Sequence, residues 1–385
     1  MSVTAAQGFT AAGIAAGIKA NGNPDLALVV NNGPRLAAAG VFTSNRVKAA
    51  PVRWSEQVLR GATVSAVVLN SGGANACTGP KGFQDTHATA EKVAAVLGGE
   101  HNAGEIAVAS TGLIGVLLPM DKLLPGIETA AAALSTDGGE AAAIAIKTTD
   151  TVHKTAAVSR DGWTVGGMAK GAGMLAPGLA TMLVVLTTDA DLDSATLDKA
   201  LRDATRTTFD RVDSDGCMST NDTVLLLGSG ASGRVPAYED FAEAVRSVCD
   251  DLARQLIGDA EGASKDIRIE VVGAASEQDA VEVGRSIARN NLLKCAIHGE
   301  DPNWGRVLSA IGTTRAAFDP DRLNVAINGV WVCKNGSVGE DRDLVSMKDR
   351  EVRITADLST GSESAVIWAN DLTAEYVHEN SAYSS

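Results

Sequence analysis

Short apolar runs rich in Val, Ile and Leu, bounded by Gly, Asn or Asp, recur along the whole chain. Several are apolar at almost every position, which is typical of strands buried on both faces. The predicted strands are Leu26–Val30, Val64–Leu69, Glu105–Ala109, Met182–Thr187, Thr223–Leu227, Ile267–Val272, Leu323–Ile327 and Glu351–Ala356. Much of the chain is therefore expected to form sheets inside the protein.

Between the strands the apolar positions follow a helical period. The predicted helices are Asp85–Leu97, Asp193–Thr205 with Asp193 as its N-cap, Tyr238–Ile257, and a helix capped by Ser276 that runs to about Arg289. The clearest apolar stripe consists of Phe241, Val245, Val248, Leu252 and Leu256. Because helices and strands are mixed along the whole chain without a low-complexity linker, the pattern predicts layered packing of helices on sheets.

Composition narrows the class of protein. A chain of 385 residues is long enough for about two domains. With 45% hydrophobic and 21% charged residues it is typical of a soluble globular protein, and 40 glycines with only 4% aromatics predict a core of small side chains. The formal charge of −14 opposes binding to nucleic acid or to anionic membranes.

Cysteines and histidines give no sign of a metal site. The 5 cysteines are scattered without a CxxC spacing, and the 5 histidines form no HExxH motif. We read no signal peptide at the N-terminus and no apolar run long enough to span a membrane. A cytoplasmic protein without metal is the expectation. The nucleophile motif GxSxG is also absent from the sequence.

Two glycine patterns resemble a dinucleotide-binding fingerprint. Gly228, Gly230 and Gly233 fit GxGxxG, and Gly171, Gly173 and Ala176 fit GxGxxA. The fingerprint requires a helix that opens within the motif, so that its N-terminus faces the pyrophosphate. Proline follows both patterns within three residues, so both are interpreted as turns.

The junction before Thr181 carries candidate chemistry. A Gly/Ala-rich stretch, Gly162–Ala180, ends directly before an apolar strand that begins with this threonine. Glycines permit strained backbone conformations, and such a loop ending on a hydroxyl residue suits an acyl shift from nitrogen to oxygen. Hydrolysis of the ester would leave Thr181 as a new N-terminus. An α-amine has a pKa of about 7.7–8.0, so it can act as a base for the neighbouring hydroxyl.

The residues at this junction also fit a plainer interpretation. A glycine-rich loop that leads into a core strand is common and needs no chemistry. From the residues alone, this alternative is the more economical one.

Several longer motifs, taken in order, change that balance. They are Ala109-Ser110-Thr111-Gly112, Thr148-Thr149-Asp150-Thr151, Lys170-Gly171-Ala172-Gly173-Met174, Ala180-Thr181-Met182-Leu183, Ser219-Thr220-Asn221-Asp222-Thr223, Glu261-Gly262-Ala263-Ser264-Lys265, Gly299-Glu300-Asp301-Pro302-Asn303-Trp304-Gly305-Arg306, and Glu375-Tyr376-Val377 followed by Asn380. In this series the sequence resembles the ornithine acetyltransferase family, also called glutamate N-acetyltransferases, of arginine biosynthesis. The resemblance covers nearly the whole chain. One departure is Gly73, where the family usually has Asn.

The resemblance implies self-cleavage between Ala180 and Thr181. The α fragment would be residues 1–180 and the β fragment 181–385, and the two would stay together and pair into an α2β2 assembly. The implied fold is α+β, with two β-sheets sandwiched between helical layers, similar to N-terminal nucleophile hydrolases but differently connected.

The resemblance also implies roles for individual residues. Thr181 would be the nucleophile that carries the acetyl group. The Thr111 hydroxyl and the Gly112 backbone N–H would form the oxyanion hole. The substrate-binding residues would be Thr148, Lys170, Thr181, Glu261, Asn380 and Ser385.

The implied reaction is a ping-pong transfer of an acetyl group from N2-acetyl-L-ornithine to L-glutamate through acetylated Thr181, without metal or bound cofactor. Acetyl-CoA stays open as a second donor. Two alternatives remain: an amidase or aminopeptidase with the same nucleophile, and a non-catalytic binding protein that keeps its glycine loop intact.

Overall fold

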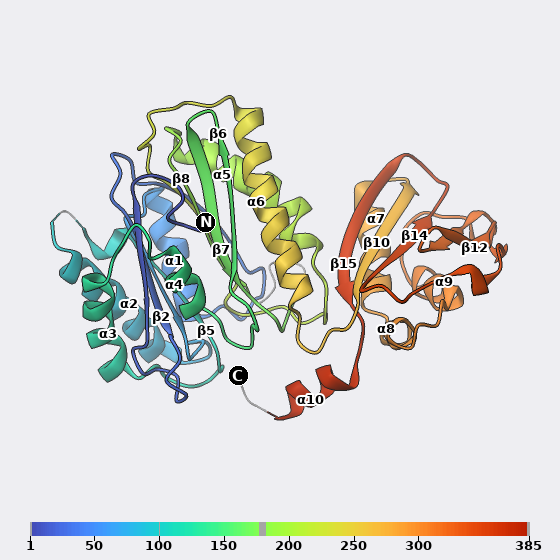
Figure 1. Cartoon of the computed structure of the whole chain (residues 1–385), viewed down its shortest axis with the longest axis horizontal. Coiled ribbons are helices and arrows are strands. Elements are labelled where there is room, and N and C mark those ends of the chain that lie inside the picture. Colours follow the sequence, from blue (N-terminus) through green and yellow to red (C-terminus); the bar gives the residue numbers. More distant parts are fainter. Residues whose placement is uncertain (1, 100, 177–181, 383–385) are drawn as a thin grey trace.

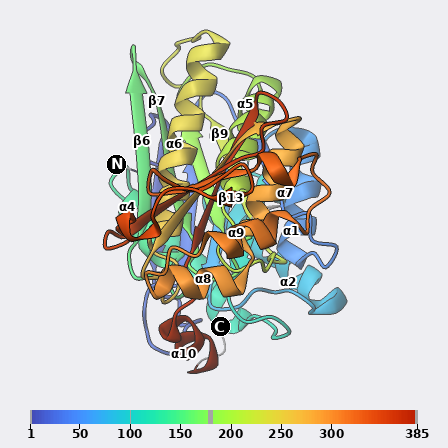
Figure 2. The ribbon, with the colours of Figure 1, turned by 90° about the vertical axis from the view of Figure 1, so that its right-hand side faces the viewer.

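The computed structural model describes residues 2–99, 101–176 and 182–382. In this part of the chain the strands form three sheets of four, five and six strands. The first two sheets belong to an N-terminal lobe that ends near residue 260, and the third forms a C-terminal lobe (Figure 1). Seen from the side of the C-terminal lobe, its strands run obliquely across α6, Tyr238–Gly258 (Figure 2).

The four-stranded sheet has the order β1-β2-β4-β5. Its strands are β1 (Phe9–Ile14), β2 (Leu26–Asn31), β4 (Ala66–Ser71) and β5 (Ile106–Thr111). The helices packed against this sheet are α1 (Ala50–Val58), α2 (Gly79–Leu97), α3 (Met120–Ala132) and α4 (Gly139–Ala145). Strands β2, β4 and β5 are buried at every position, because α2 and α3 cover one face, and the five-stranded sheet together with α4 covers the other.

The five-stranded sheet has the order β3-β9-β8-β7-β6. Its strands are β3 (Ala37–Phe42), β6 (Lys154–Arg160), β7 (Trp163–Lys170), β8 (Leu183–Thr188) and β9 (Thr223–Gly228). Along β8, Leu183 and Val185 pack against the first sheet, while Val184 and Leu186 pack against α6 and α5, Ser194–Thr207. This alternation explains the continuous apolar run in the sequence. The prediction of two sheets sandwiched between helical layers is confirmed for the N-terminal lobe.

The third sheet was not predicted. Its order is β13-β12-β11-β14-β10-β15. The strands are β10 (Asp266–Ala274), β11 (Asn324–Ile327), β12 (Val330–Lys334), β13 (Ser337–Val338), β14 (Glu351–Asp357) and β15 (Glu363–Asn370). The helices α7 (Glu277–Ala288), α8 (Asn291–His298) and α9 (Trp304–Ile311) share a core with this sheet. After β15 the chain returns to the N-terminal lobe through α10, Ala374–Ala382.

Local sequence signals predicted where several helices begin. The predicted N-caps of α5 and α7 are confirmed, since Asp193 accepts from Thr196 N–H at 2.8 Å and Ser276 accepts from Asp279 N–H at 3.1 Å. The helix predicted to start at Asp85 begins six residues earlier, at Gly79, because Pro80 suits the first turn. No described helix is both long and apolar enough to cross a membrane.

The glycine pattern after β9 is a turn, as predicted. Gly230 and Gly233 have φ of 66° and 63°, and the next helix begins only at Tyr238. The predicted fragments, 1–180 and 181–385, do not coincide with the two lobes. Their boundary falls between β7 and β8, which are neighbours in one sheet. The division into fragments stays a prediction.

Candidate active site

A small cavity of about 90 Å³ lies where the ends of β5 and β7 meet the segment after α6 and helix α10. The lining residues are Thr111, Gly112, Ile114, Thr148, Thr149, Lys170, Gly173, Met174, Glu261 and Asn380. The lining thus brings together segments from both predicted fragments.

The end of β5 supplies the predicted oxyanion-hole residues. Strand β5 pairs in parallel with β4 and ends at Thr111, whose carbonyl accepts from Gly73 N–H at 3.0 Å. Gly112 then turns the chain with φ of 130°, and a Cβ there would lie 2.7 Å from the Gly73 nitrogen. Only glycine fits this conformation and this close approach. The fold therefore fixes the direction of the backbone after Thr111.

Lys170, the last residue of β7, reaches into the cavity and is almost completely buried. Its ammonium donates to Thr111 Oγ1 at 3.1 Å. Burial lowers the pKa of Lys170, while the negative charge of Asp150 opposes that shift. Because Thr111 Oγ1 already accepts from Lys170, the hydroxyl proton of Thr111 can be directed elsewhere in the cavity.

Asp150 is a charged support that the sequence analysis left without a role. It accepts from Lys154 Nζ at 2.7 Å, from Gly171 N–H at 2.6 Å and from Thr148 N–H at 3.0 Å. Burial alone would raise the pKa of Asp150, but the charges of Lys170 and Lys154 outweigh it and hold the pKa at about 2. Asp150 thus stays ionised and fixes both the Thr148 turn and the loop after Lys170.

Glu261 lies on the opposite side of the cavity, after α6. Its carboxylate accepts from Thr149 Oγ1 at 2.6 Å and from Asn380 Nδ2 at 3.0 Å. A Cβ on Gly173 would lie 2.5 Å from Glu261 Oε2, so a larger residue there would displace this carboxylate from its present position. Asn380 comes from α10, and this contact anchors the C-terminal helix to the cavity.

Six of the predicted site residues therefore line one cavity: Thr111, Gly112, Thr148, Lys170, Glu261 and Asn380. Ala180, Thr181 and Ser385 lie outside the described residues. The chain directly after Thr181 is well defined, because Leu183 pairs with Lys170 in the sheet and Met182 N–H donates to Asp222 Oδ1 at 3.1 Å.

Asp222 belongs to the motif Ser219–Thr223, and the sequence analysis predicted no role for it. It is fully buried, and burial raises its pKa well above the usual value, although the Met182 N–H and the charge of Lys170 act in the opposite direction. Its neighbour Asn221 donates to the carbonyls of Ala74 and Ser110 at 2.6 and 2.8 Å. The motif Ser219–Thr223 thus joins the strand after Thr181 to the loops around Thr111.

The departure at Gly73 leaves the local hydrogen bonding intact. Asn70 Nδ2 donates to the Gly73 carbonyl at 3.0 Å, and Asn70 Oδ1 accepts from Ser110 Oγ at 2.5 Å. Within the described residues, no group of three or more His, Cys, Asp or Glu side chains is arranged to hold a metal ion.

Comparisons with known proteins agree on one family. The model of the ArgJ family matches residues 10–385. The arginine biosynthesis bifunctional protein ArgJ of Streptomyces avermitilis is 84% identical over 385 residues, which is 100% of both chains.

Two solved structures are also similar. The crystal structure of the Bacillus halodurans arginine biosynthesis bifunctional protein ArgJ is 35% identical with a TM-score of 0.50, and the match covers 52% of this chain and 98% of that one. The ornithine acetyltransferase of Mycobacterium tuberculosis, solved in complex with ornithine, is 61% identical with a TM-score of 0.46, covering 47% of this chain and 96% of that one.

Proposed function

The chain belongs to the ArgJ family, and on this premise we propose that it transfers an acetyl group from N2-acetyl-L-ornithine to L-glutamate through an acetylated Thr181. It is an acyltransferase of arginine biosynthesis. The observation that carries the proposal is the convergence of Thr111, Gly112, Lys170 and Glu261 on one small cavity.

In the proposed first half-reaction, Thr181 Oγ attacks the acetyl carbonyl while the free α-amine of the same residue takes the proton. Negative charge then develops on the carbonyl oxygen. The Thr111 hydroxyl and the Gly112 N–H stabilise this charge, and the hydrogen bond from Lys170 to Thr111 Oγ1 supports the proposal because it leaves the hydroxyl proton available for donation. Ornithine leaves as the amine, and the acetyl group stays on Thr181 as an ester.

In the second half-reaction, the amine of glutamate attacks this ester in the same cavity. The donor, N2-acetyl-L-ornithine, carries an ammonium on its side chain and a carboxylate, and the cavity offers one partner for each in Glu261 and Lys170. Thr148, Asn380 and Ser385 complete the proposed set of substrate contacts.

We propose further that the chain cleaves itself between Ala180 and Thr181 and assembles as α2β2. Two observations support cleavage. The loop after β7 is rich in glycine and contains Met174 at a φ of 54°, a left-handed value unusual for this residue type. The Bacillus halodurans chain, matched over 98% of its length, covers only 52% of this chain, about one fragment.

The proposed reaction needs no metal or bound cofactor, and acetyl-CoA is a possible second donor of the acetyl group. We place the protein in the cytoplasm. All 5 cysteines are free thiols, and such thiols persist in a reducing compartment.

The test is the intact mass of the denatured protein combined with an acetyl-transfer assay. We expect two fragments that meet between Ala180 and Thr181, and ornithine release from N-acetylornithine that continues beyond one equivalent per site only when glutamate is present. Continued release without glutamate would favour the amidase alternative. A single uncut chain without acetyl transfer would favour the binding protein.

A further inference from the structure

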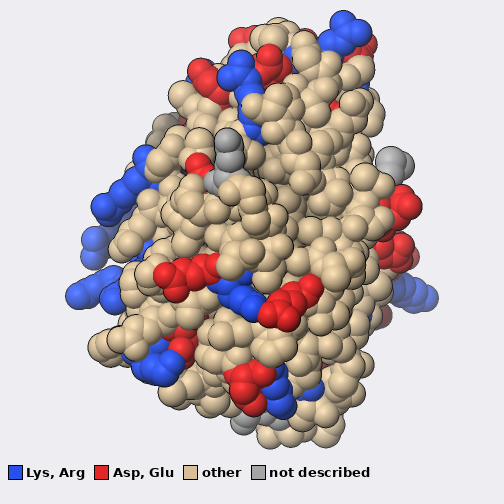
Figure 3. Space-filling model, turned by 90° about the vertical axis from the view of Figure 1, so that its left-hand side faces the viewer, with Lys and Arg blue, Asp and Glu red and all other residues tan. Residues whose placement is uncertain are grey.

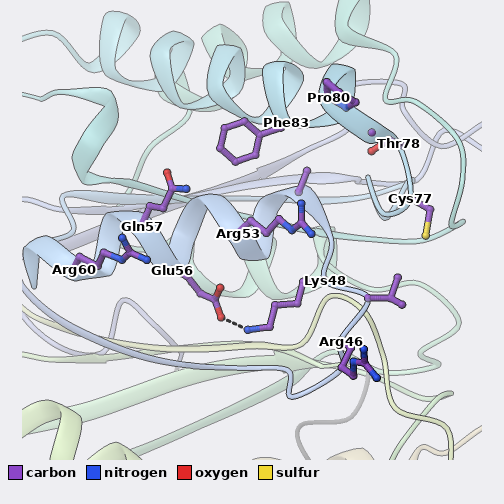
Figure 4. A pocket seen from close by; sticks show the side chains of 13 residues that line it. Arg46, Lys48, Arg53, Glu56, Gln57, Arg60, Cys77, Thr78, Pro80 and Phe83 are labelled. Carbon is purple, nitrogen blue, oxygen red and sulfur yellow. Dashed lines mark hydrogen bonds and ion pairs between the residues drawn. The ribbon is translucent and has the colours of Figure 1, made fainter.

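A second, larger cleft of about 730 Å³ lies between α1 and the start of α2 (Figure 4). Its lining is strongly basic, with four cationic side chains and one carboxylate. The cations are Arg46, Lys48, Arg53 and Arg60, and the carboxylate is Glu56. We call this group the basic cleft. A formal charge of +3 in one cleft is unexpected in a chain whose net charge is −14.

Lys48 forms an ion pair with Glu56. The side chains of the other three cations, Arg46, Arg53 and Arg60, make no ion pair or hydrogen bond with any residue that the structure describes. On the face of the molecule in Figure 3, by contrast, acidic and basic side chains largely lie in mixed groups. Like charges that gather without counter-charges raise the local positive potential and favour an anion.

The backbone on the far side of the cleft adds donors. Helix α2 begins with Gly79 and Pro80 in the cleft wall, its first turn holds no acidic residue, and its N-cap residue Thr78 makes no capping hydrogen bond. Thr78 Oγ1 instead donates to Asn75 Oδ1. The N-terminus of this 19-residue helix therefore adds partial positive charge to the wall of the cleft.

Size and composition indicate the class of ligand. A volume of about 730 Å³ lies in the range of pockets for small organic molecules and exceeds what one phosphate needs. Several separated guanidinium groups suit a ligand with more than one phosphate, because each can form paired hydrogen bonds to phosphate oxygens. Phe83, at the wall formed by α2, offers an apolar surface beside the cations (Figure 4).

We propose that the basic cleft binds a diphosphate-bearing ligand of nucleotide size. Arg46, Arg53 and Arg60 hold the phosphates, with the start of α2 on the other side. This inference does not depend on the proposed acetyl transfer, since none of these residues lines the cavity at Thr111.

The basic cleft is nevertheless connected to that cavity. Cys77 and Thr78 of the cleft follow a segment that pairs with the loop after β5: Ala74 N–H donates to the Leu113 carbonyl at 3.1 Å, and Gly115 N–H donates to the Ala76 carbonyl at 2.9 Å. Ile114, between these two contacts, lines the active-site cavity. A ligand in the basic cleft would thus touch a segment that supports the oxyanion hole.

The test is isothermal titration of the full-length protein with inorganic phosphate, inorganic pyrophosphate, ADP and coenzyme A at about 50 mM salt, where screening is weak. We expect pyrophosphate, ADP or coenzyme A to bind one per chain and more tightly than phosphate. Tighter binding of ADP or coenzyme A than of pyrophosphate would support a ligand of nucleotide size. Binding of pyrophosphate without binding of ADP or coenzyme A would overturn that part of the proposal.

Matched variants locate the binding. Arg53→Gln should weaken it by about tenfold, the loss expected for one charged hydrogen bond, and the triple variant with Arg46→Gln and Arg60→Gln should abolish it. Arg315→Gln, an exposed arginine of the C-terminal lobe, is the control and should leave binding unchanged. The transfer of acetyl groups from N-acetylornithine to glutamate in the absence of these ligands should stay within about twofold in all variants.

Three results would overturn the proposal. The first is that no diphosphate probe binds in a saturable way, and the second is that the triple variant still binds the probes. The third is that the triple variant alters the sedimentation coefficient, and therefore the oligomeric state, without altering ligand binding. The last result would make the basic cleft an interface between copies of the chain. Thermal unfolding of each variant, expected within about 2 °C of the parent, separates loss of binding from loss of fold.

Discussion

Cationic side chains lie at both the active-site cavity and the basic cleft, but they differ in burial and in whether they are paired with acidic residues. Lys170 lines the cavity and is buried, as are Asp150 and Lys154 behind it, and Glu261 accepts two hydrogen bonds at the cavity wall. In the basic cleft, Arg46, Arg53 and Arg60 are exposed, and their side chains form no ion pair with a residue that the structure describes. A buried charge must be paired with an opposite charge or hydrogen-bonded within the fold. An exposed charge is solvated by water and stays available to bind a ligand. The difference indicates a preorganised site for a zwitterion in one region and a site for an anion in the other.

The strongest test of a preorganised cavity is Thr111→Val. The substitution keeps the size of the side chain but removes the hydroxyl that accepts from Lys170. We expect kcat for acetyl transfer to fall by about 10²–10³, as for other losses of one oxyanion donor. Steady-state kinetics measure this, and Thr129→Val on the exposed face of α3 is the control. A fall of less than tenfold would mean that Thr111 does not stabilise the transition state.

Glu261→Gln tests the substrate side of the same cavity. The change removes the charge while keeping the shape, so hydrogen bonds from Thr149 and Asn380 weaken and the side-chain ammonium of N2-acetylornithine loses its partner. We expect kcat/KM for N2-acetylornithine to fall by about 10–100-fold. The exposed Glu363→Gln serves as the control. An unchanged kcat/KM for N2-acetylornithine would show that Glu261 does not bind its ammonium.

Acid unfolding tests how strongly the fold depends on buried charge. The pKa of Asp150 is about 2 in the folded protein, below the ordinary value of 3.8 for an aspartate. A depressed carboxyl pKa contributes stability that is complete above the unfolded pKa and is lost as pH falls toward the folded one. We expect about 2 kcal/mol to disappear between about pH 4 and pH 2.

Urea unfolding of the parent and of Asp150→Asn over this pH range measures that loss. The stability difference between the two proteins should shrink as pH falls, while the exposed Asp137→Asn should behave like the parent. A difference in the free energy of unfolding that stays constant from pH 5 to pH 2 would contradict the lowered pKa of Asp150 in the folded protein.

The smallest effect is expected in the basic cleft. Arg53→Gln should change the free energy of unfolding by no more than about 0.5 kcal/mol, because the side chain is exposed and makes no described ion pair. Urea unfolding without ligand measures this value. A loss above about 1 kcal/mol would show that Arg53 supports the fold and would weaken the contrast between the two regions.

Local signals in the sequence predicted many of the helices and strands of this fold. The sequence analysis missed those features that depend on contacts between distant segments. The caps at Asp193 and Ser276 and the apolar run of β8 depend on neighbouring residues, so their positions could be read directly. The strand order of the six-stranded sheet could not be read from the sequence, because β10 pairs with β14 and β15, which lie about 80 residues or more further along the chain.

The candidate site shows the same limit. The residue types at Thr111 and Lys170 were identified through their motifs, and the structure brings them within 3.1 Å, although their roles stay predictions. Asp150 was passed over, because a sequence does not say which charges are buried together. The basic cleft was missed for a related reason: its arginines precede β4, and the opposite wall, from Cys77 to Phe83, follows it.

The ladder between β7 and β8 has a kinetic consequence if the chain is cut as proposed. Lys170 and Leu183 are directly paired, so the two fragments would share one sheet. Before the cut, a short tether keeps these strands at a high effective concentration, and the sheet forms in a first-order process. After the cut, fully unfolded fragments would have to meet by diffusion, and refolding would become second order. The uncut precursor should therefore refold at a rate independent of dilution, whereas the mature protein should refold more slowly at each dilution.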